Sequence, residues 1–295
     1  MDWDKLRIFH TVAEAGSFTQ AGEDLHLSQS AVSRQVAGLE EALDCVLFHR
    51  HARGLHLTEQ GKLLFKTVHD VFGKLSMVEN VLDESREQPA GPLKISTTVA
   101  MGSVWLTPRI HEFLDLYPDI DVSLVATDFE LDLSMGEADC ALRLMPPTQP
   151  DLIRRHLTVI HNHIFAAPEY IQKYGMPQGF EDLANHRLIA FGKDALAPVP
   201  ALNWLVETEI EDGPIQPVLT VNNIYGILRA VQSGLGIAAL PDFLAREISN
   251  LVRVMPDQEG PSFDAYFVYP EELRDARRIT VFRDFLIRKI SETRF

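Results

Sequence analysis

Four side chains suited to nucleic-acid contact recur at helical spacing near the N-terminus of this 295-residue chain. They are Gln29, Ser30, Ser33 and Arg34. Amides, hydroxyls and guanidinium groups hydrogen-bond to base edges and phosphates, so this polar face is chemically suited to a DNA groove. The opposite face is apolar and would fix the register of the segment on a core, through Val32, Val36, Leu39 and Leu43.

Local signals predict the helices that position this face. A first helix is expected to end at Gly16, which favours a left-handed C-terminal cap. Ser17 begins a capping box, so a second helix is expected over residues 18–25. Ser28 is suited to cap the third helix, which we expect from Gln29 to Leu43. The pattern predicts two short helices joined by a tight turn.

Two short strands should follow as a wing, over residues 47–50 and 55–57. Arg50 and Arg53 lie at this wing, and we expect both to reach the phosphate backbone. A short helix pair with a polar exposed face also occurs in proteins that bind no DNA. This segment alone therefore leaves a DNA-binding role and a purely structural role open.

Bulk charge does not favour nucleic acid, because the formal net charge is -15. DNA contact must therefore come from a local basic patch. Only Cys45 and Cys140 occur, far apart in apolar stretches, which fits a reducing compartment and no disulfide framework. There is no signal-peptide pattern at the start and no apolar run approaching ~20 residues. We expect a cytoplasmic protein without a membrane partner.

A long uninterrupted helix is predicted from Thr58 to Gln88. Apolar residues repeat along it in alternating steps of four and three, at Leu64, Val68, Val71, Leu75, Val78 and Leu82. This is the pattern of a coiled-coil seam, and a second copy of the chain is its natural partner. Packing of the helix on the chain's own C-terminal domain is the alternative.

Beyond Pro89–Pro92, which should break this helix, the pattern changes to α/β. Strands are expected over residues 93–98, 121–126, 138–144, 218–221 and 237–240, and helices from 107 to 117, 223 to 232 and 276 to 292.

The N-terminal segment resembles the winged helix-turn-helix of LysR-type transcriptional regulators. The resemblance rests on Phe9, Val12-Ala13-Glu14, Gly16-Ser17-Phe18, Ala21, Leu25, Ser28-Gln29-Ser30-Ala31-Val32-Ser33, Leu39-Glu40, Leu47-Phe48, Arg50 and Leu57-Thr58-Glu59-Gln60-Gly61. The family often has a basic residue near Ala37-Gly38, so Arg34, Arg50 and Arg53 should here carry an unusual share of the DNA contact.

The C-terminal region looks like the effector-binding domain of the same family, which is similar to type 2 periplasmic binding proteins. The motifs are looser, chiefly Tyr117-Pro118-Asp119, Asp139-Cys140-Ala141-Leu142-Arg143, Val221-Asn222-Asn223 and the run from Gly234 to Pro241. The resemblance implies an α/β fold with two lobes and a cleft for a small-molecule effector. It also implies dimerisation through the linker helix, a homotetramer, double-stranded promoter DNA as a partner, and contact with RNA polymerase.

These inferences give a domain division. We expect a winged helix-turn-helix domain over residues 1–58 (helix-turn-helix about 18–42, wing 47–57), a linker and dimerisation helix over 59–88, a hinge over 89–92, and an effector-binding domain over 93–295. The resemblance places lobe I at about 93–162 and 268–295, and lobe II at about 163–267.

Candidate effector-binding residues follow the expected strands, where helix N-termini offer backbone N–H groups to carboxylates or other polar molecules. They are Thr97, Thr98, Val99, Ala100, Met101, Thr127, Arg143, Asn222 and Asn223. The two threonines at 97 and 98 are also ordinary strand residues, Asn222 is also suited to cap a helix, and Arg143 to pair ionically between the lobes.

Other functions find less support in the sequence. His49, His51 and His56 cluster on the wing and His161 and His163 flank Asn162, but no further ligand is specified, so no metal is expected. No catalytic set or cofactor motif can be assembled, so we expect neither enzyme activity nor a cofactor. The alternative function is a solute-binding or sensor protein that uses the α/β cleft without sequence-specific DNA binding.

Overall fold

The computed structural model describes residues 2–51, 54–82, 88–147, 149, 151–192, 199, 201–208, 210–211, 213, 215–247 and 250–293. The chain forms two compact units, Met1–Glu79 and Asn80–Phe295. The predictions for Arg53, for the side chains of Arg50, Val78 and Leu82, and for residues 83–87 of the linker lie outside the described residues. In the described part of the chain, no helix is long and apolar enough to cross a membrane.

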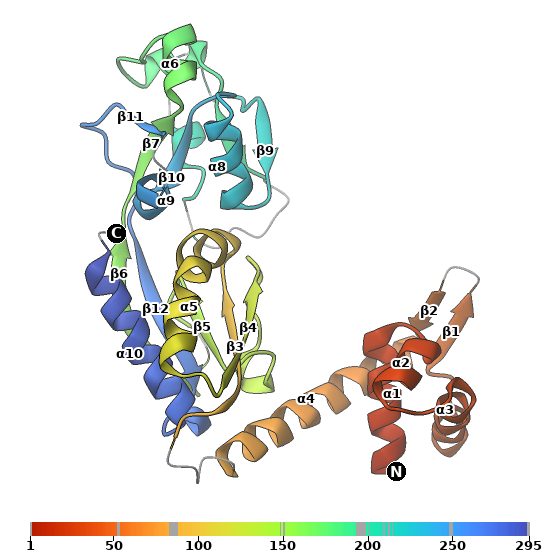
Figure 1. The fold of residues 1–295 in the computed structure, drawn as a ribbon. Coiled ribbons are helices and arrows are strands. Elements are labelled where there is room, and N and C mark those ends of the chain that lie inside the picture. Colours follow the sequence, from red (N-terminus) through yellow and green to blue (C-terminus); the bar gives the residue numbers. More distant parts are fainter. Residues whose placement is uncertain are drawn as a thin grey trace. The chain divides into compact units, whose positions relative to one another are not determined.

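The N-terminal unit contains helices and a two-stranded wing (Figure 1). Its elements are α1 (Trp3–Ala15), α2 (Phe18–Asp24), α3 (Gln29–Leu43), β1 (Phe48–His51), β2 (Gly54–Leu57) and α4 (Glu59–Leu82). The expected caps form: Gly16 adopts a left-handed φ of 60°, and the Ser17 and Ser28 hydroxyls accept hydrogen bonds from backbone N–H groups three residues on. Local capping chemistry therefore sets the ends of the three helices.

Helix α4 uses its apolar residues in two ways. Val68 is only 4% exposed, and Leu64, Phe65 and Phe72 pack with it against the core of α1, α3 and the wing. Further along the helix, Val71 is 41% exposed and Leu75 is 44% exposed. The first part of the predicted seam thus belongs to the unit's own core, because the helix starts directly after the wing. The later described part remains available to a partner.

Gly61, in the first turn of α4, is required by close packing on the wing. A Cβ at this position would overlap the backbone carbonyl oxygen of Leu47, which accepts a hydrogen bond from the Thr58 N–H. We expect Gly61→Ala to destabilise the N-terminal unit by about 1–3 kcal/mol, the usual cost of overpacking. Chemical denaturation, followed by hydrogen exchange of the amides of β1 and β2, measures this change.

Gly38→Ala is the matched control for this substitution. A Cβ at Gly38 would meet only the flexible Lys5 ammonium group, at 3.0 Å, and alanine favours the helix interior. This variant should be neutral or slightly more stable. Equal destabilisation by both substitutions would contradict the packing argument.

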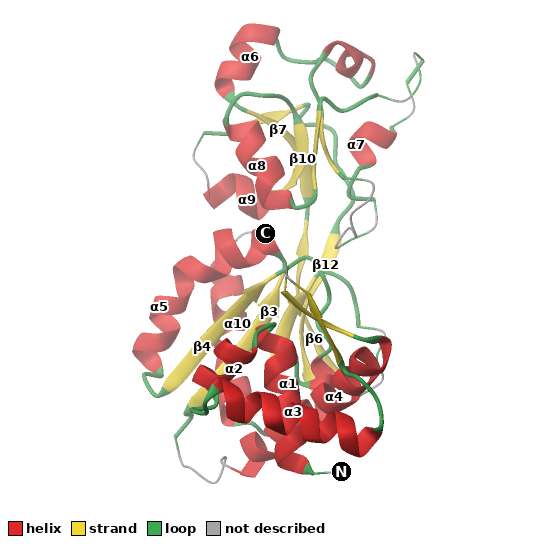
Figure 2. Ribbon diagram, turned by 90° about the vertical axis from the view of Figure 1, so that its right-hand side faces the viewer, coloured by secondary structure: helices red, strands yellow, loops and turns green. Residues whose placement is uncertain are grey.

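The larger unit has two lobes joined by long strands (Figure 1). Lobe I contains a five-stranded sheet in the order β4-β3-β5-β12-β6, with the first three strands parallel and β12 antiparallel to both of its neighbours. The strands are β3 (Gly91–Thr97), β4 (Ile120–Ala126), β5 (Cys140–Arg143), β6 (Leu152–Ile160) and β12 (Phe263–Pro270). Helices α5 (Thr107–Leu116) and α10 (Arg277–Glu292), both labelled in Figure 2, belong to the same lobe. They pack together through Phe113, Phe282 and Phe285.

Lobe II is built on two smaller sheets. A three-stranded antiparallel sheet has the order β10-β7-β11, and β8 pairs in parallel with β9. The strands are β7 (Asn162–Ala166), β8 (Ile189–Phe191), β9 (Leu219–Val221), β10 (Ala238–Pro241) and β11 (Val252–Val254), and the helices are α6 (Pro168–Tyr174), α7 (Trp204–Glu207), α8 (Ile224–Gln232) and α9 (Asp242–Glu247). The short 3-10 turns are η3 (Leu133–Met135), η4 (Glu181–Asn185) and η5 (Glu271–Leu273).

Several features of this unit differ from the sequence-based expectation, because the strands β6, β7, β8, β11 and β12 and the helices α6, α7 and α9 were not predicted. The helical segment before α5 starts at Val99 and includes a π-helical stretch, η2 (Met101–Leu106), whereas we expected the helix to begin at Thr107. The sequence does not reveal this earlier start. The wide π-helical turn breaks the usual 3.6-residue spacing of apolar residues in a helix, which affects the apolar residues at 104–106. In addition, β12 joins the lobe I sheet from Phe263, so the return strand begins before the boundary placed at about residue 268.

Candidate DNA-binding surface and effector cleft

The polar face predicted for the third helix is presented on α3. Gln29, Ser30 and Arg34 are exposed and Ser33 is half-buried. Val32, Val36 and Leu39 on the other side are at most 1% exposed and form the core with α1. The buried stripe therefore fixes which side chains face outward. Among the described residues Arg34 forms no ion pair, so its guanidinium remains available to an anion.

Two polar residues attach the start of the wing to its neighbouring helices, Glu40 to α3 and Thr58 to α4. The carboxylate of Glu40 accepts hydrogen bonds from the backbone N–H groups of Leu47 at 2.7 Å and Phe48 at 3.3 Å. The Thr58 hydroxyl donates to the carbonyl of Val46 at 2.7 Å and accepts from the Gly61 N–H at 2.9 Å. These contacts position the wing, and the sequence analysis assigned them no role. The signal in the sequence that could have indicated these contacts was a polar residue, Glu40, facing the expected turn.

The wing consists of two antiparallel strands of four residues each. His49 lies opposite His56, and Arg50 lies opposite Leu55. The strand position of Arg50 is described, but its side chain and all of Arg53 are outside the described residues. The assignment of phosphate contacts to these two arginines therefore remains a prediction.

Two neighbouring cavities lie at the ends of the lobe I strands, and one of them is also lined by residues of lobe II. The threonine cavity, of about 40 Å³, is bounded by polar residues at the ends of β3, β4 and β5, among them Thr97, Thr98, Thr127 and Arg143. The apolar cavity, of about 20 Å³, combines lobe I residues with residues of lobe II, among them Leu202, Ile224, Pro241 and Phe243. Three residues line both cavities: Thr98, Asp128 and Leu144.

The predicted effector residues divide between these cavities and their surroundings. Thr97, Thr98, Thr127 and Arg143 line the threonine cavity, and Ala100 lines the apolar cavity. Val99 and Met101 lie in the adjoining helical turn without lining either cavity as described. Asn222 and Asn223 are not among the lining residues: the Asn223 side chain caps α8 by accepting from the Gly226 N–H at 2.7 Å, and donates to Asn222 at 3.1 Å.

Arg143 is already engaged by lobe I. Its side chain is 8% exposed, donates to the Leu131 carbonyl at 2.7 Å, and lies 3.7 Å from the Glu130 carboxylate. It is therefore less available to an anionic ligand than its position in the cavity wall suggests.

Asp128 is the feature of this cleft that the sequence analysis did not select. Its Oδ1 accepts a hydrogen bond from the Val99 N–H at 3.1 Å, so a carboxylate of the chain itself occupies the start of the helical segment. Its Oδ2 is buried without a hydrogen-bond partner among the described residues. Burial raises the pKa of this carboxyl, while the Val99 hydrogen bond acts in the opposite direction. Its position directly after a strand was the signal that could have identified it.

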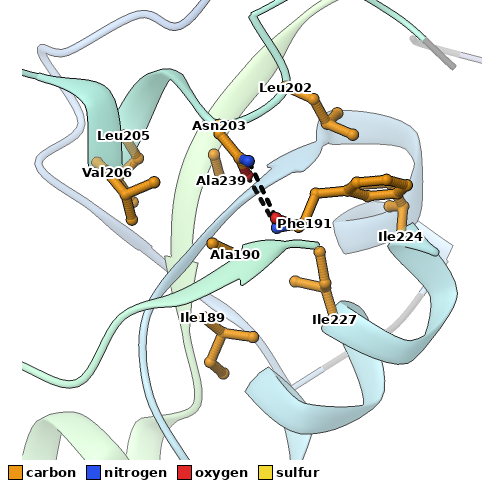
Figure 3. A pocket seen from close by; sticks show the side chains of 10 residues that line it. All are labelled: Ile189, Ala190, Phe191, Leu202, Asn203, Leu205, Val206, Ile224, Ile227 and Ala239. Carbon is orange, nitrogen blue, oxygen red and sulfur yellow. Dashed lines mark hydrogen bonds between the residues drawn. The ribbon is translucent and has the colours of Figure 1, made fainter. Parts of the chain in front are cut away.

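A third, smaller cavity of about 10 Å³ lies within lobe II and shares Leu202 and Ile224 with the apolar cavity. Figure 3 shows Asn203 as its polar wall residue. The Asn203 amide exchanges two hydrogen bonds with the Phe191 backbone, at 2.8 and 3.0 Å, so it is satisfied by the protein. The Asn203 side chain therefore offers no free polar anchor in this cavity.

Comparison with known proteins identifies the family of both parts of the chain. The family model described as a bacterial regulatory helix-turn-helix protein of the lysR family matches residues 3–62, and the LysR substrate binding domain matches residues 86–291. The transcriptional regulator CrgA of Neisseria meningitidis serogroup C is 31% identical over 293 residues, covering 97% of this chain and 96% of that protein.

Solved structures of LysR-type regulators also resemble this chain. The structure of CrgA from Neisseria meningitidis has a TM-score of 0.61 and 30% identity, covering 98% of this chain and 99% of that one. Full-length CbnR complexed with its target DNA has a TM-score of 0.65 over 99% of each chain, but its 19% identity indicates a shared fold only.

A winged helix-turn-helix followed by a two-lobed α/β domain with a cleft defines a ligand-controlled DNA-binding protein. The matched family models show that this chain belongs to the LysR family of transcriptional regulators. It is a DNA-binding transcriptional regulator with a substrate-binding domain of that family. The related proteins are named as transcriptional regulators and not as enzymes.

Proposed function

We propose that the chain regulates transcription in response to a small molecule that has an apolar body and a hydrogen-bond donor, held in the cleft between the lobes. The observation that carries this proposal is the buried Asp128 Oδ2, which lacks a partner among the described residues and lies where the two cavities meet. An unpaired buried acceptor favours a ligand with an amine, hydroxyl or N–H group.

Charge disfavours a simple carboxylate effector. The Val99 N–H, at the position where a helix start would bind an anion, already donates to Asp128, and Arg143 is engaged by Leu131 and Glu130. A carboxylate here would face a second carboxylate at short range. The apolar cavity instead suits a hydrocarbon portion, with Ile224 and Phe243 as walls.

The small volumes of the two cavities support a coupling to lobe movement. Cavities of about 20 and 40 Å³ have room for only a few water molecules. A ligand of several heavy atoms therefore requires the lobes to separate or to shift. Such a ligand can alter the regulator only by binding one lobe arrangement more tightly than another.

A thermal-shift screen of the full chain tests this effector class. Amines and alcohols with aliphatic or aromatic bodies are compared with carboxylates of matched carbon number, for example benzylamine and benzyl alcohol with benzoate. We expect the stabilising compounds to be donors, and Asp128→Ala to remove their effect, while Asp115→Ala on the exposed side of α5 retains it. Stabilisation by carboxylates that survives Asp128→Ala would contradict the proposal.

Asp128→Asn should stabilise the ligand-free protein at neutral pH. Because the folded-state pKa is raised above its ordinary value, ionisation of Asp128 costs stability. This penalty develops as the pH rises through the ordinary aspartate pKa of about 3.9 and persists above the folded-state pKa. We expect a higher Tm at pH 7 than for wild type, because the substitution removes this penalty.

Calorimetry at pH 7 and at a pH below the ordinary aspartate range checks the sign of this effect. The difference between wild type and Asp128→Asn should vanish at the acidic pH, where both side chains are neutral. A difference that grows on acidification would contradict it.

Assembly and cellular context complete the proposal. We propose a dimer through the exposed apolar residues of α4, a tetramer built from two such dimers, contact with RNA polymerase at the promoter, and action in the cytoplasm without catalysis. The family resemblance and the exposed Val71 and Leu75 support this assembly. We also propose that the domains comprise residues 1–58, 59–88, 89–92 and 93–295. The proposed DNA contacts are Gln29, Ser30, Ser33, Arg34, Arg50 and Arg53.

A further inference from the structure

Two histidines and a glutamate converge between α1 and α4, inside the N-terminal unit. His10 Nε2 lies 3.0 Å from His69 Nδ1. The Glu14 carboxylate lies 3.4 Å from His10 Nδ1 and 3.9 Å from His69 Nδ1. One ligand atom from each residue can be chosen so that all three lie within 4.8 Å of one another. Within the described residues, neither the wing histidines nor His161 and His163 belong to such a group.

The surroundings of this cluster hold its central imidazole in place. The His10 side chain is 12% exposed, and its ring stacks on Phe65 and lies against Phe72, each with ring centroids 5.1 Å apart. The His69 side chain is 33% exposed and that of Glu14 is 52% exposed, so the cluster opens to solvent on one side. An apolar inner wall and an open outer side allow an ion to enter a largely preformed site.

Burial lowers the pKa of His10, and the His69 ring acts in the same direction, while the Glu14 carboxylate opposes them. The neutral imidazole is the form that coordinates metals.

We propose that His10, Glu14 and His69 bind one divalent first-row transition ion, with Zn²⁺ as the preferred occupant. Two imidazole nitrogens on a tetrahedral zinc, each about 2.0–2.1 Å from the metal, lie about 3.3 Å apart. The 3.0 Å separation in this structure is a few tenths of an ångström shorter. Two nitrogen ligands and one carboxylate suit zinc, and the fourth position is left to water.

The consequence of binding follows from the elements that carry the ligands. His10 and Glu14 lie one turn apart on α1, which packs against α3, whereas His69 lies on α4. A bound ion would therefore fasten the helix-turn-helix to the start of the linker helix. Because the ligands converge only in the folded unit, the ion should stabilise that unit.

Isothermal titration of ZnCl₂ into the EDTA-dialysed full chain at neutral pH tests this site. We expect one zinc per chain and a rise in the thermal transition of the N-terminal unit. His69→Gln should abolish the site. Glu14→Gln, at an exposed position where folding is not at risk, should weaken zinc binding by at least about tenfold. His111→Gln on α5 removes a histidine outside the cluster and should bind like wild type.

Three results would overturn the proposal. One is the absence of saturable zinc binding, which would leave the histidine pair as a simple hydrogen bond between the helices. Another is wild-type affinity in both His69→Gln and Glu14→Gln. The third is loss of zinc on His56→Gln but not on His69→Gln, which would place the ion on the wing.

Discussion

Replacing both Gln29 and Arg34 with alanine is expected to reduce affinity for the cognate operator about 100-fold or more. Each residue is exposed on α3 and can form paired hydrogen bonds with a base edge, an interaction worth about 1–3 kcal/mol of discrimination. Neither side chain contributes to the core, so the circular dichroism spectrum and thermal stability should be unchanged. Fluorescence anisotropy with the regulator's own upstream DNA measures the loss.

Gln35→Ala is the matched control, because Gln35 is an exposed glutamine of the same helix outside the predicted contact set. Its affinity should stay within about threefold of wild type. Scrambled DNA provides the second comparison. If the double substitution lowered affinity for operator and scrambled DNA equally, these side chains would contact phosphates only, and base recognition by this face of α3 would be wrong.

The second large effect is expected from charge on the exposed apolar face of α4. Val71→Asp combined with Leu75→Asp should convert the proposed dimer to a monomer, because two carboxylates cannot be buried in an apolar helix interface. Both side chains are more than 40% exposed, so the fold of the unit should survive. Operator affinity should fall at least about 100-fold, since the two half-sites would then be bound independently. Analytical ultracentrifugation gives the assembly state.

Lys66→Asp introduces the same side chain at an exposed position on the other side of α4 and should leave the assembly intact. If the doubly substituted protein remained dimeric with unchanged DNA affinity, the interface would lie elsewhere and α4 would only connect the two units.

Features encoded by neighbouring residues could be predicted from the sequence. The bounds of α3 follow from the Ser28 cap and the apolar stripe, and the lobe I strands β3, β4 and β5 follow from their alternating or apolar runs, whereas β6 and β12 were not predicted. The sequence could not show that one part of α4 belongs to a core and another part stays exposed. Val68 and Val71 belong to one heptad pattern, and only the fold places Val68 in a core.

Contacts between residues that are far apart in sequence could not be predicted from periodicity. Asp128 meets Val99 across 29 positions of sequence, and His10 meets His69 across 59. Nothing in either local pattern indicates these contacts, because parallel strand order and helix packing create them. For the same reason, the apolar side of the cleft formed by Leu202, Ile224 and Phe243 could be identified only from the structure.

The central claim is that this acidic chain recognises a specific DNA sequence through its N-terminal unit. Its most direct test is the ratio of affinities for its own upstream DNA and for a scrambled duplex, measured over a range of salt concentrations. We expect a ratio of about 10³ or more, with both affinities falling as salt rises because phosphate contacts release counterions. Equal, weak binding to the two duplexes at every salt concentration would contradict it.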